Sequence, residues 1–438
     1  MHYSKIALMN DSYFTDNFKQ EPFWWERSPR PADENNPLPK SADVVIIGSG
    51  YTGLSAAIQT AKHGLHTVVV DAESAGWGCS SRNGGQVSTS LKPSFLQLQA
   101  KYGRDKAVAI LSEGYNALNW VESFTQEANI DCDFKRVGLF CGAHNKAALQ
   151  GYRDTIANTV PEFETQPFIV EPKDTRKEID SDDYMGGMVL PHHGSIDPGR
   201  YHLGLLAHAK QLGVEVISHC KVDDISKSAG KFNVSTTKGN ISAKDVLVAT
   251  SGYTGKLTPW QQQRIIPIGS YVIATEPLAE GQLETLIPND RMVIDSRKVV
   301  VYFRSCPERK RIIFGGRVSL NETNPKLSGP KLHALMVQRF PMLHDIKISH
   351  SWMGFVGYTF NEMPHLGKQD GIHYSMGYCG SGVSLASYFG MRIGLQIAGQ
   401  PEGATALDDL NFENRFYYRG NPWFLAPSLF YYRWKDAR

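Results

Sequence analysis

The chain has 438 residues, of which 41% are hydrophobic and 21% charged, and its formal net charge is +2. This length is enough for two or three domains, and the near-neutral charge gives no electrostatic reason to expect nucleic acid or an anionic membrane as a partner. The six cysteines lack metal-binding spacing, no stretch is apolar enough to span a membrane, and the N-terminus lacks a signal-peptide pattern. We therefore expect a cytoplasmic protein without a metal site.

Residues 1–41 are aromatic and polar and contain five prolines. We expect this segment to be an irregular arm that lies over the body of the protein rather than a domain. Trp24 and Trp25 are expected to be buried against that body.

The pattern changes at Ala42. The run ADVVIIGSG is continuously apolar and ends in glycine, which is typical of a buried parallel strand. Residues 52–63 predict a helix rich in small residues that stops at Gly64, and HTVVVDAE predicts a second buried strand that ends at Asp71. This segment is expected to be a βαβ unit.

The glycine motif GSGYTG (48–53) joins that strand to that helix, and Asp71 follows eighteen residues after Gly53. This is the context of the dinucleotide-binding fingerprint. Gly48 permits the tight turn, Gly50 lets a pyrophosphate approach the backbone, and Gly53 lets helix and strand pack closely. The helix N-terminus stabilises phosphates, and Asp71 is expected to accept hydrogen bonds from a ribose. An accidental glycine turn in an α/β sheet is the alternative.

The next loop, GWGCSSRNGGQ (76–86), distinguishes FAD from NAD. It offers backbone donors, hydroxyl groups and the cation of Arg82 to a long anionic cofactor. An NAD-binding domain does not usually carry such a cluster there, so the loop favours FAD. A flexible surface loop is the alternative.

The rest of the chain alternates between the two kinds of element. Residues 92–130 are predicted to be helical, about 131–186 mixed, and 199–212 a helix that precedes the strand VEVIS. DVLVATSGYTG is another buried strand that runs into glycine. Alternation from about 260 to 350 predicts antiparallel strands. GYCGSGV (377–383) begins an apolar helix whose N-terminal amides can face the pyrimidine end of a flavin; a helix-capping turn is the alternative.

This order predicts an α/β (α+β) fold with a discontinuous Rossmann-like FAD-binding domain and a second, mostly antiparallel substrate domain. The FAD-binding domain is assigned to 42–91, 187–258 and, with the C-terminal tail, 351–438. The substrate domain is assigned to 92–186, including the helical part, and 259–350, and the arm to 1–41.

Taken together, GSGYTGLSAA, GWGCSSRNGGQ, PIGSYVIATEPL, IIFGGR and GYCGSGV resemble the D-amino acid oxidase superfamily of flavoproteins, in particular its γ-glutamylputrescine oxidase branch. The resemblance runs from about residue 11 to the C-terminus. It implies FAD bound by one domain and covered by an antiparallel sheet. It also implies oxidation of an amine to an imine, with O2 reduced to hydrogen peroxide and the imine hydrolysed to an aldehyde or keto acid.

Two charged residues receive catalytic roles from the resemblance. Lys256 is similar to the lysine that sarcosine oxidases place over the flavin to assist O2, where a fixed cation stabilises incipient superoxide. Arg304 lies where related amino acid oxidases keep an arginine near the substrate carboxylate. A solvated lysine and a structural salt bridge are the alternatives.

Several aromatic and glycine positions are candidates for the pocket. Tyr302, Tyr358 and Tyr378 are expected to line it for an alkylamine, with a purely core role as the alternative. Trp352 and Gly354 resemble the strand beside the flavin, where glycine permits close backbone approach; a packing glycine is the alternative.

The sequence departs from the family pattern at two places. Ser381 stands where the branch commonly has histidine, which alters the expected tuning of the flavin. The position that carries covalent flavin in monomeric sarcosine oxidases corresponds to Val301, and Cys306 lies on the wrong side of that strand. Noncovalent FAD is therefore expected.

The expected cofactor-binding residues are Gly48, Gly50, Tyr51, Thr52, Gly53, Asp71, Ala72, Gly78, Cys79, Ser80, Arg82, Asn83, Gly84, Gly85, Gln86, Val222, Ser251, Gly252, Trp352, Gly354, Gly380, Ser381, Gly382 and Val383.

The leading interpretation is an FAD-dependent amine oxidase, with γ-glutamylputrescine or another ω-substituted amine as substrate and O2 as acceptor. An amino acid dehydrogenase that passes electrons to quinone and a flavin-binding subunit without turnover are the alternatives. The choice of amine and the oligomeric state stay open, because pocket shape is not encoded in motifs.

Overall fold

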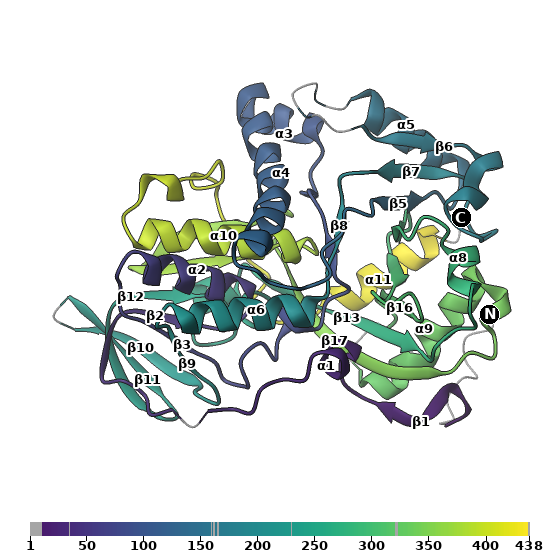
Figure 1. The fold of residues 1–438 in the computed structure, drawn as a ribbon. Helices are drawn as coiled ribbons and strands as arrows, with labels where there is room; N and C mark the ends of the chain where they lie inside the picture. The colour runs from purple at the N-terminus through teal and green to yellow at the C-terminus, as the bar shows by residue number, and fades with distance from the viewer. Residues whose placement is uncertain are drawn as a thin grey trace.

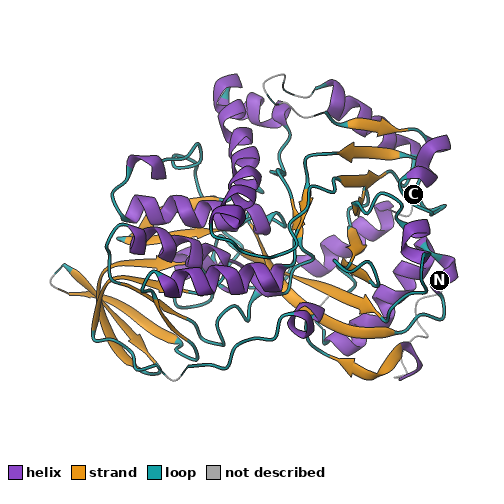
Figure 2. Ribbon diagram, viewed as in Figure 1, coloured by secondary structure: helices purple, strands orange, loops and turns teal. Residues whose placement is uncertain are grey.

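Two large β-sheets, each covered by its own helices, organise the protein in this computed structural model (Figures 1 and 2). The structure describes residues 11–34, 36–158, 160, 163, 166–228, 230–319 and 323–436. The predicted α/β fold class is confirmed, because one sheet is built around parallel strands and the other is mostly antiparallel.

The first sheet has eight strands, in the order β10-β11-β12-β2-β3-β9, with β19 beside β12 and β18 beside β19. Its parallel strands are β2 (Ser41–Ile47), β3 (Thr67–Val70), β9 (Glu215–Ile217), β12 (Gly239–Val248) and β19 (Ile372–Met376). The antiparallel members are β10 (Val222–Ser228), β11 (Lys231–Thr236) and β18 (His365–Gln369). Three distant chain segments build this sheet, which confirms the predicted discontinuity.

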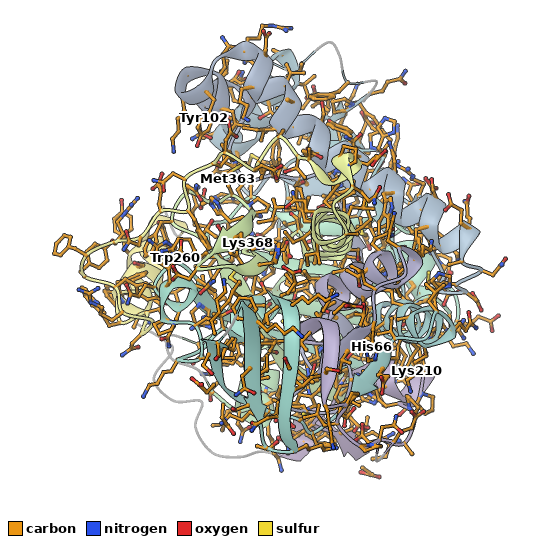
Figure 3. The ribbon with its side chains drawn as sticks, turned by 90° about the vertical axis from the view of Figure 1, so that its left-hand side faces the viewer. His66, Tyr102, Lys210, Trp260, Met363 and Lys368 are labelled. Atoms are coloured by element: carbon orange, nitrogen blue, oxygen red, sulfur yellow. The ribbon has the colours of Figure 1, made fainter. Side chains whose placement is uncertain are left out.

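Helices α2 (Tyr51–Lys62), α6 (Pro198–Gln211) and α10 (Gly382–Ile397) lie together on one face of this sheet (Figure 1). Helix α2 can pack closely on α10 because Gly390 and Gly394 have no Cβ, and a Cβ at either position would overlap the backbone of α2. The predicted run of small residues in α2 serves the same close packing. Figure 3 views this part of the molecule end on, with His66 and Lys210 on one side and Trp260 on the other.

The second sheet has nine strands in the order β1-β17-β13-β16-β15-β14-β5-β7-β6. They are β1 (Phe14–Lys19), β17 (Ile348–Tyr358), β13 (Ile266–Thr275), β16 (Ile312–Gly316), β15 (Val301–Ser305), β14 (Met292–Asp295), β5 (Leu139–Gly142), β7 (Gly187–Leu190) and β6 (Phe168–Val170). All neighbours are antiparallel except β1 with β17 and β14 with β5.

The remaining helices are α1 (Phe23–Arg27), α3 (Phe95–Tyr102), α4 (Arg104–Glu127), α5 (Lys146–Ala157), α7 (Pro259–Gln262), α8 (Gln282–Leu286), α9 (Pro325–Arg339) and α11 (Leu425–Asp436). The short 3₁₀ helices are η1 (Asp11–Tyr13), η2 (Cys79–Ser81), η3 (Pro172–Lys177), η4 (Ser251–Tyr253), η5 (Pro341–Leu343) and η6 (Pro401–Gly403), and β4 (Gln86–Val87) pairs with β8 (Gly194–Ser195). The predicted helical stretch 92–130 is divided at Gly103, whose φ of 82° breaks the helix.

The N-terminal arm is more regular than the sequence predicted. Within its described residues, β1 adds an edge strand to the nine-stranded sheet and α1 follows it. Trp24 is fully buried and Trp25 half-buried, while residues 1–10 of the expected arm lie outside the described part. The arm prediction therefore needs correction: the segment is partly a strand of the second sheet.

Two segment boundaries also differ from those expected. β7, assigned from sequence to the FAD-binding domain, pairs with β5 and β6 in the nine-stranded sheet. β17 continues to Tyr358, eight residues beyond residue 350, where the substrate domain was expected to end, because its whole length pairs with β13. Glycines at 354 and 357 let this strand pass close to Cys79 and to Ser251, respectively, where a Cβ would clash.

Candidate functional site

A cavity of about 1290 Å³ opens between the two sheets. Its walls come from the C-terminal ends of β2, β3 and β12, the loop 76–86, strands β13 to β17, the start of α10, and α11. A parallel sheet places ligands at the carboxyl ends of its strands. The volume exceeds the ~300–1,000 Å³ typical of small-ligand sites, as a site for a dinucleotide and a substrate requires.

The predicted glycine motif forms the turn between β2 and α2. Gly48 has a φ of 105°, which favours glycine, and a Cβ at Gly53 would overlap the Gly48 carbonyl oxygen. A Cβ at Gly50 would lie 2.8 Å from Ser80 Oγ, so this residue lets the 76–86 loop approach the helix. Gly50 is the N-cap of α2 without a capping side chain, and it lines the cavity. This end of the helix is suited to bind phosphate.

Asp71 is held at the cavity by Ser49. Its Oδ2 accepts hydrogen bonds from the Ser49 amide at 2.8 Å and the Ser49 hydroxyl at 2.6 Å, and its Oδ1 accepts from the Glu73 amide at 3.0 Å. Burial raises the pKa of Asp71, while the bonds from Ser49 act in the opposite direction. A carboxylate has about four acceptor positions, so capacity for a ribose hydroxyl is left.

His202, in helix α6, holds the same turn through a hydrogen bond to its backbone. Its Nε2 lies 2.8 Å from the Ser49 carbonyl oxygen, which can only accept, so Nε2 donates. Burial lowers the pKa of His202 to about 3, which keeps the ring neutral. Arg30 Nη2 can then donate to the free Nδ1 at 3.3 Å.

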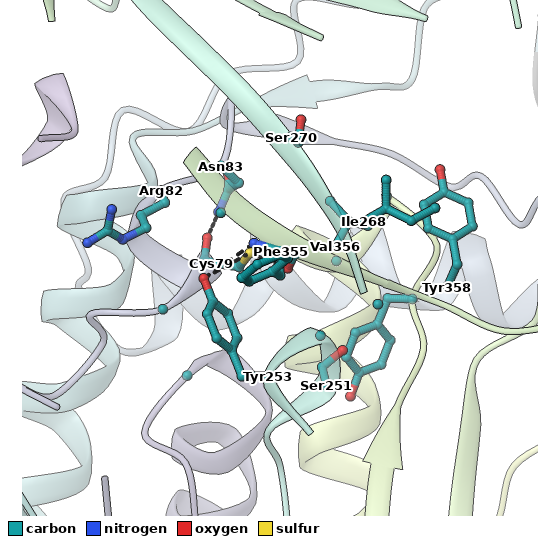
Figure 4. Close-up of a pocket in the computed structure, with 18 of the residues that line it drawn as sticks. Cys79, Arg82, Asn83, Ser251, Tyr253, Ile268, Ser270, Phe355, Val356 and Tyr358 are labelled. Carbon is teal, nitrogen blue, oxygen red and sulfur yellow. Dashed lines mark hydrogen bonds between the residues drawn. The ribbon is translucent and has the colours of Figure 1, made fainter. Parts of the chain in front are cut away.

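The loop 76–86 is shaped by its own side chains. Asn83 Nδ2 donates to the carbonyls of Cys79 at 3.2 Å and Ser80 at 3.0 Å, and its Oδ1 accepts from the Gly85 amide at 2.8 Å. Cys79 Sγ lies 3.8 Å from Tyr253 Oη (Figure 4). Burial raises the pKa of Cys79 to about 11, so the thiol stays protonated at neutral pH.

Strand β17 holds this loop from the other side. Trp352 is fully buried, and its Nε1 donates to the Arg82 carbonyl at 2.7 Å. A Cβ at Gly354 would lie 2.9 Å from Cys79 Sγ, which explains glycine there. Trp352 therefore positions the loop without lining the cavity, whereas Gly354 lines it.

Tyr378 and Tyr358 differ in what their hydroxyls do. Tyr378 Oη lies 2.7 Å from Thr52 Oγ1 and 3.0 Å from Ser375 Oγ, so it ties the α10 loop to α2. Tyr358 lines the cavity next to Gly380, where a built Cβ would lie 3.7 Å from its Oη. Burial raises the pKa of both phenols, for Tyr378 to about 12.

Tyr302 is held rigidly in the cavity wall. Its ring fills the space beside Gly84 and Gly315, where a Cβ would clash with it, and its Oη lies 3.0 Å from Ser270 Oγ. Burial raises the pKa of Tyr302 to about 12, so the phenol is neutral at physiological pH. This pair of hydroxyls offers both a donor and an acceptor to a bound molecule.

Arg304 does not reach the cavity. Its Nη1 donates to the carbonyls of Gly85 at 3.1 Å and Ile196 at 2.9 Å, and its Nε donates to Ser305 at 2.9 Å. Tyr302 and Arg304 are two residues apart and lie on the same face of β15, but the bonds of Arg304 to the carbonyls of Gly85 and Ile196, beneath the 76–86 loop, keep it out of the cavity lining. Arg304 therefore supports the loop and does not line the cavity in which a substrate carboxylate would bind.

Arg317, at the end of β16, is the buried arginine that does line the cavity. Its Nη1 donates to the Gly269 carbonyl at 2.8 Å. The motif IIFGGR contains this residue, but nothing in the motif distinguishes it from Arg304 as a candidate. A guanidinium that lines a cavity is suited to bind a carboxylate.

Of the described residues, four exposed lysines line the cavity: Lys92, Lys221, Lys256 and Lys298. Lys256, the lysine expected from the family resemblance, follows η4. Lys92 was not predicted: its Nζ would lie 3.9 Å from a Cβ built on Gly380, so the ammonium lies beside the loop that begins α10.

Helix α11 closes the cavity on the side of the second sheet. Leu425, Ser428, Leu429 and Tyr432 recur at helical spacing and line it, while Phe430 points outward and is 69% exposed. The expected C-terminal tail is thus partly a wall of the cavity. Its sequence lacks a motif, so only the tertiary structure reveals this role.

Most of the predicted site residues line this one cavity. Among the catalytic and substrate candidates, Lys256, Tyr302, Tyr358 and Tyr378 do so and Arg304 does not. Among the cofactor candidates, the residues that do not line it are Gly53, Gly85, Trp352 and Ser381. Gly53 and Trp352 act by packing and by holding the loop, as described above.

The residues present fit FAD. The glycine turn leaves space that a Cβ would fill, the helix end is suited to phosphate, and Asp71 lies at the end of β3. Ala72 and Val222 line the cavity near that end. The other end, beside Tyr302 and Gly354, has room for an aromatic ring system and a substrate.

Comparison with known proteins agrees with this geometry. A family model described as "FAD dependent oxidoreductase" (DAO) matches residues 43–394. The chain is 32% identical over 372 residues to "Probable oxidoreductase OrdL" of Rhizobium meliloti (strain 1021), covering 84% of this chain and 86% of that protein. It is 31% identical over 378 residues to "Gamma-glutamylputrescine oxidoreductase" of Escherichia coli (strain K12), covering 84% and 87%.

Solved structures show the same fold. Glycine oxidase from Geobacillus kaustophilus superposes with a TM-score of 0.71 at 16% identity, covering 86% of this chain and all of that one. L-amino acid deaminase from Proteus vulgaris gives a TM-score of 0.68 at 18% identity, covering 91% and 97%. In the described part of the chain, no helix is both long and apolar enough to cross a membrane.

Proposed function

The chain belongs to the DAO family of FAD-dependent oxidoreductases, and from this membership we propose that it oxidises the carbon beside the nitrogen of a carboxylate-bearing amine, with O2 as the electron acceptor. The observation that carries the proposal is that one cavity joins the dinucleotide turn to a wall containing Tyr302, Ser270 and Arg317. A γ-glutamylated or similarly ω-substituted amine fits this combination, and the relative named for γ-glutamylputrescine supports it.

The chain's own residues bind and orient the amine. Arg317 is suited to hold a carboxylate remote from the reacting carbon, and the hydroxyls of Tyr302 and Ser270 can hold a neutral amine. Leu425 and Leu429 of α11 offer apolar contact to a methylene chain and keep water out.

Bound FAD would supply a two-electron acceptor for the hydride and a route for those electrons to O2, which would be released as hydrogen peroxide. Loss of hydride from the neutral amine leaves an iminium ion, and water hydrolyses it to an aldehyde and ammonium. No strong base is needed for this sequence. Lys256 is proposed to place a fixed positive charge in the cavity, where it stabilises reduced oxygen.

Noncovalent FAD and a cytoplasmic location are part of the proposal. All six cysteines are free thiols in the structure, as in a reducing compartment. Cys306 is buried and does not line the cavity, so it is not placed to form a bond to the flavin.

Anaerobic mixing of the purified yellow protein with amines tests the function. Bleaching by γ-glutamylputrescine, followed by return of the colour and peroxide release in air, is expected. Bleaching that air does not reverse would favour the dehydrogenase instead. Absence of bleaching with putrescine, γ-glutamylputrescine, sarcosine, glycine and D-amino acids would contradict the proposal.

A further inference from the structure

Residues 14–34 of the N-terminal arm cross from one sheet to the other. At its start, β1 pairs with β17 of the nine-stranded sheet. At its end, Asp33 Oδ2 accepts from Ser74 Oγ at 2.6 Å and lies 2.7 Å from His219 Nε2. The match to the family model begins only at residue 43, so the arm lies outside it.

Between these anchors, two tryptophans bind the loop 76–86. Trp24 Nε1 donates to the Asn83 carbonyl at 2.8 Å, and Trp25 Nε1 donates to Ser81 Oγ at 2.9 Å. Both acceptors belong to the loop that lines the cavity through Arg82 and Asn83. The arm therefore contacts the loop on the side away from the cofactor space.

Trp25 also stacks on Arg82. The Arg82 guanidinium lies 4.7 Å from the Trp25 ring centroid and 4.4 Å from that of Trp77. An arginine between two indole faces is held by cation–π attraction on both sides. One of these two faces comes from the arm.

The arm reaches the phosphate turn as well. Arg30 Nη2 lies 3.3 Å from His202 Nδ1, and His202 Nε2 donates to the Ser49 carbonyl, which lies in the glycine motif. One short segment thus contacts the 76–86 loop directly and the glycine turn through His202.

We propose that this arm is a cofactor clamp: it holds the 76–86 loop, through Trp24 and Trp25, in the shape that retains FAD. A loop that is already ordered loses less conformational entropy when the cofactor binds, so the clamp raises affinity without touching the cofactor. Trp25 is a positioning residue in this scheme, because it acts through Ser81 and Arg82.

Trp25→Leu tests the clamp, with FAD affinity measured by fluorescence titration of the apoprotein. Loss of one hydrogen bond and one cation–π contact is expected to raise the FAD Kd about tenfold. Trp120→Leu is the matched control: Trp120 is a half-buried tryptophan stacked on Phe124 and does not line the cavity, and its removal is expected to leave the Kd unchanged.

A purely structural role for Trp25 predicts a different pattern. In that case Trp25→Leu would lower the melting temperature of the apoprotein but leave the FAD Kd of the folded protein within twofold of the wild type. That result would overturn the clamp. Hydrogen exchange of residues 76–86 in the apoprotein gives a second readout, and faster exchange in Trp25→Leu is expected.

Ser81→Ala approaches the same contact from the loop, in case Trp25→Leu does not fold. It is expected to raise the Kd about fivefold. Ser81→Ala also removes the bond that Ser81 Oγ donates to the Gly76 carbonyl at 2.6 Å, so the double variant with Trp25→Phe, which keeps an aromatic ring but loses the donor, is expected to match Ser81→Ala alone. Full additivity would contradict the proposal.

Discussion

Gly53 packs its backbone against the carbonyl of Gly48, where a Cβ would overlap the oxygen. Gly53→Ala is therefore expected to push α2 away from β2 and to abolish FAD retention. The ratio of flavin to protein absorbance after purification measures this. Gly151→Ala is the control, because a Cβ there meets nothing within 4 Å, and we expect it to keep full flavin content.

Arg317 and Arg304 separate substrate binding from loop support. Arg317→Met is expected to lower kcat/KM about 100-fold for a carboxylate-bearing amine, since it removes a charge-assisted hydrogen bond, and to change little for putrescine, which has no carboxylate. Arg304→Met is expected to lower the flavin content, and therefore to lower the activity with both substrates equally, because Arg304 donates to the carbonyls of Gly85 and Ile196. Equal losses on both substrates in Arg317→Met would refute the assignment.

At the scale of elements, α11 offers neighbouring residues with opposite orientations. Leu429 lines the cavity and Phe430 is exposed. Leu429→Ser is expected to raise the KM of an amine with a polymethylene chain about tenfold, because apolar contact with the chain is lost. Phe430→Ser should leave steady-state kinetics unchanged, and a similar rise in both variants would argue against α11 as a wall of the substrate space.

The elements also differ in how far sequence predicted them. β2 and α2 follow from local pattern, because an apolar run, three glycines and small residues dictate a strand, a turn and a closely packed helix. β1 was missed because its pairing partner, β17, lies more than 300 residues away in the chain. Pairing across such a distance leaves no local periodicity.

At the scale of the whole molecule, buried histidines set the acid stability. Burial lowers the pKa of His193, His202 and His365 to about 3. Below the unfolded value of about 6.5 the unfolded chain binds protons that the folded chain does not, so the free energy of unfolding falls as pH falls. Each histidine contributes about 1.4 kcal/mol per pH unit well below pH 6.5.

Urea denaturation of the apoprotein at pH 7.5 and 5.5 measures this slope. His202→Gln removes one titrating group while an amide can still donate to the Ser49 carbonyl, so its stability should fall less between the two pH values than that of the wild type. An unchanged difference would show that His202 is not neutral in the fold.

The cofactor half of the site was predictable because its chemistry depends on backbone. Glycines at 48, 50 and 53 and an acid after the next strand determine where a dinucleotide lies, and these appear within 24 residues of one another in the sequence. The family resemblance supplied FAD and amine chemistry on the same motifs, and the family match supports that expectation.

The substrate half was decided only by tertiary structure. The family resemblance pointed to Arg304, whereas in the fold the Arg304 side chain bonds to the carbonyls of Gly85 and Ile196, and Arg317, directly after β16, lines the cavity. The arm and α11 come from opposite ends of the chain and meet the same site. Side chains from distant segments carry this part of the site, and no local pattern records which of them converge.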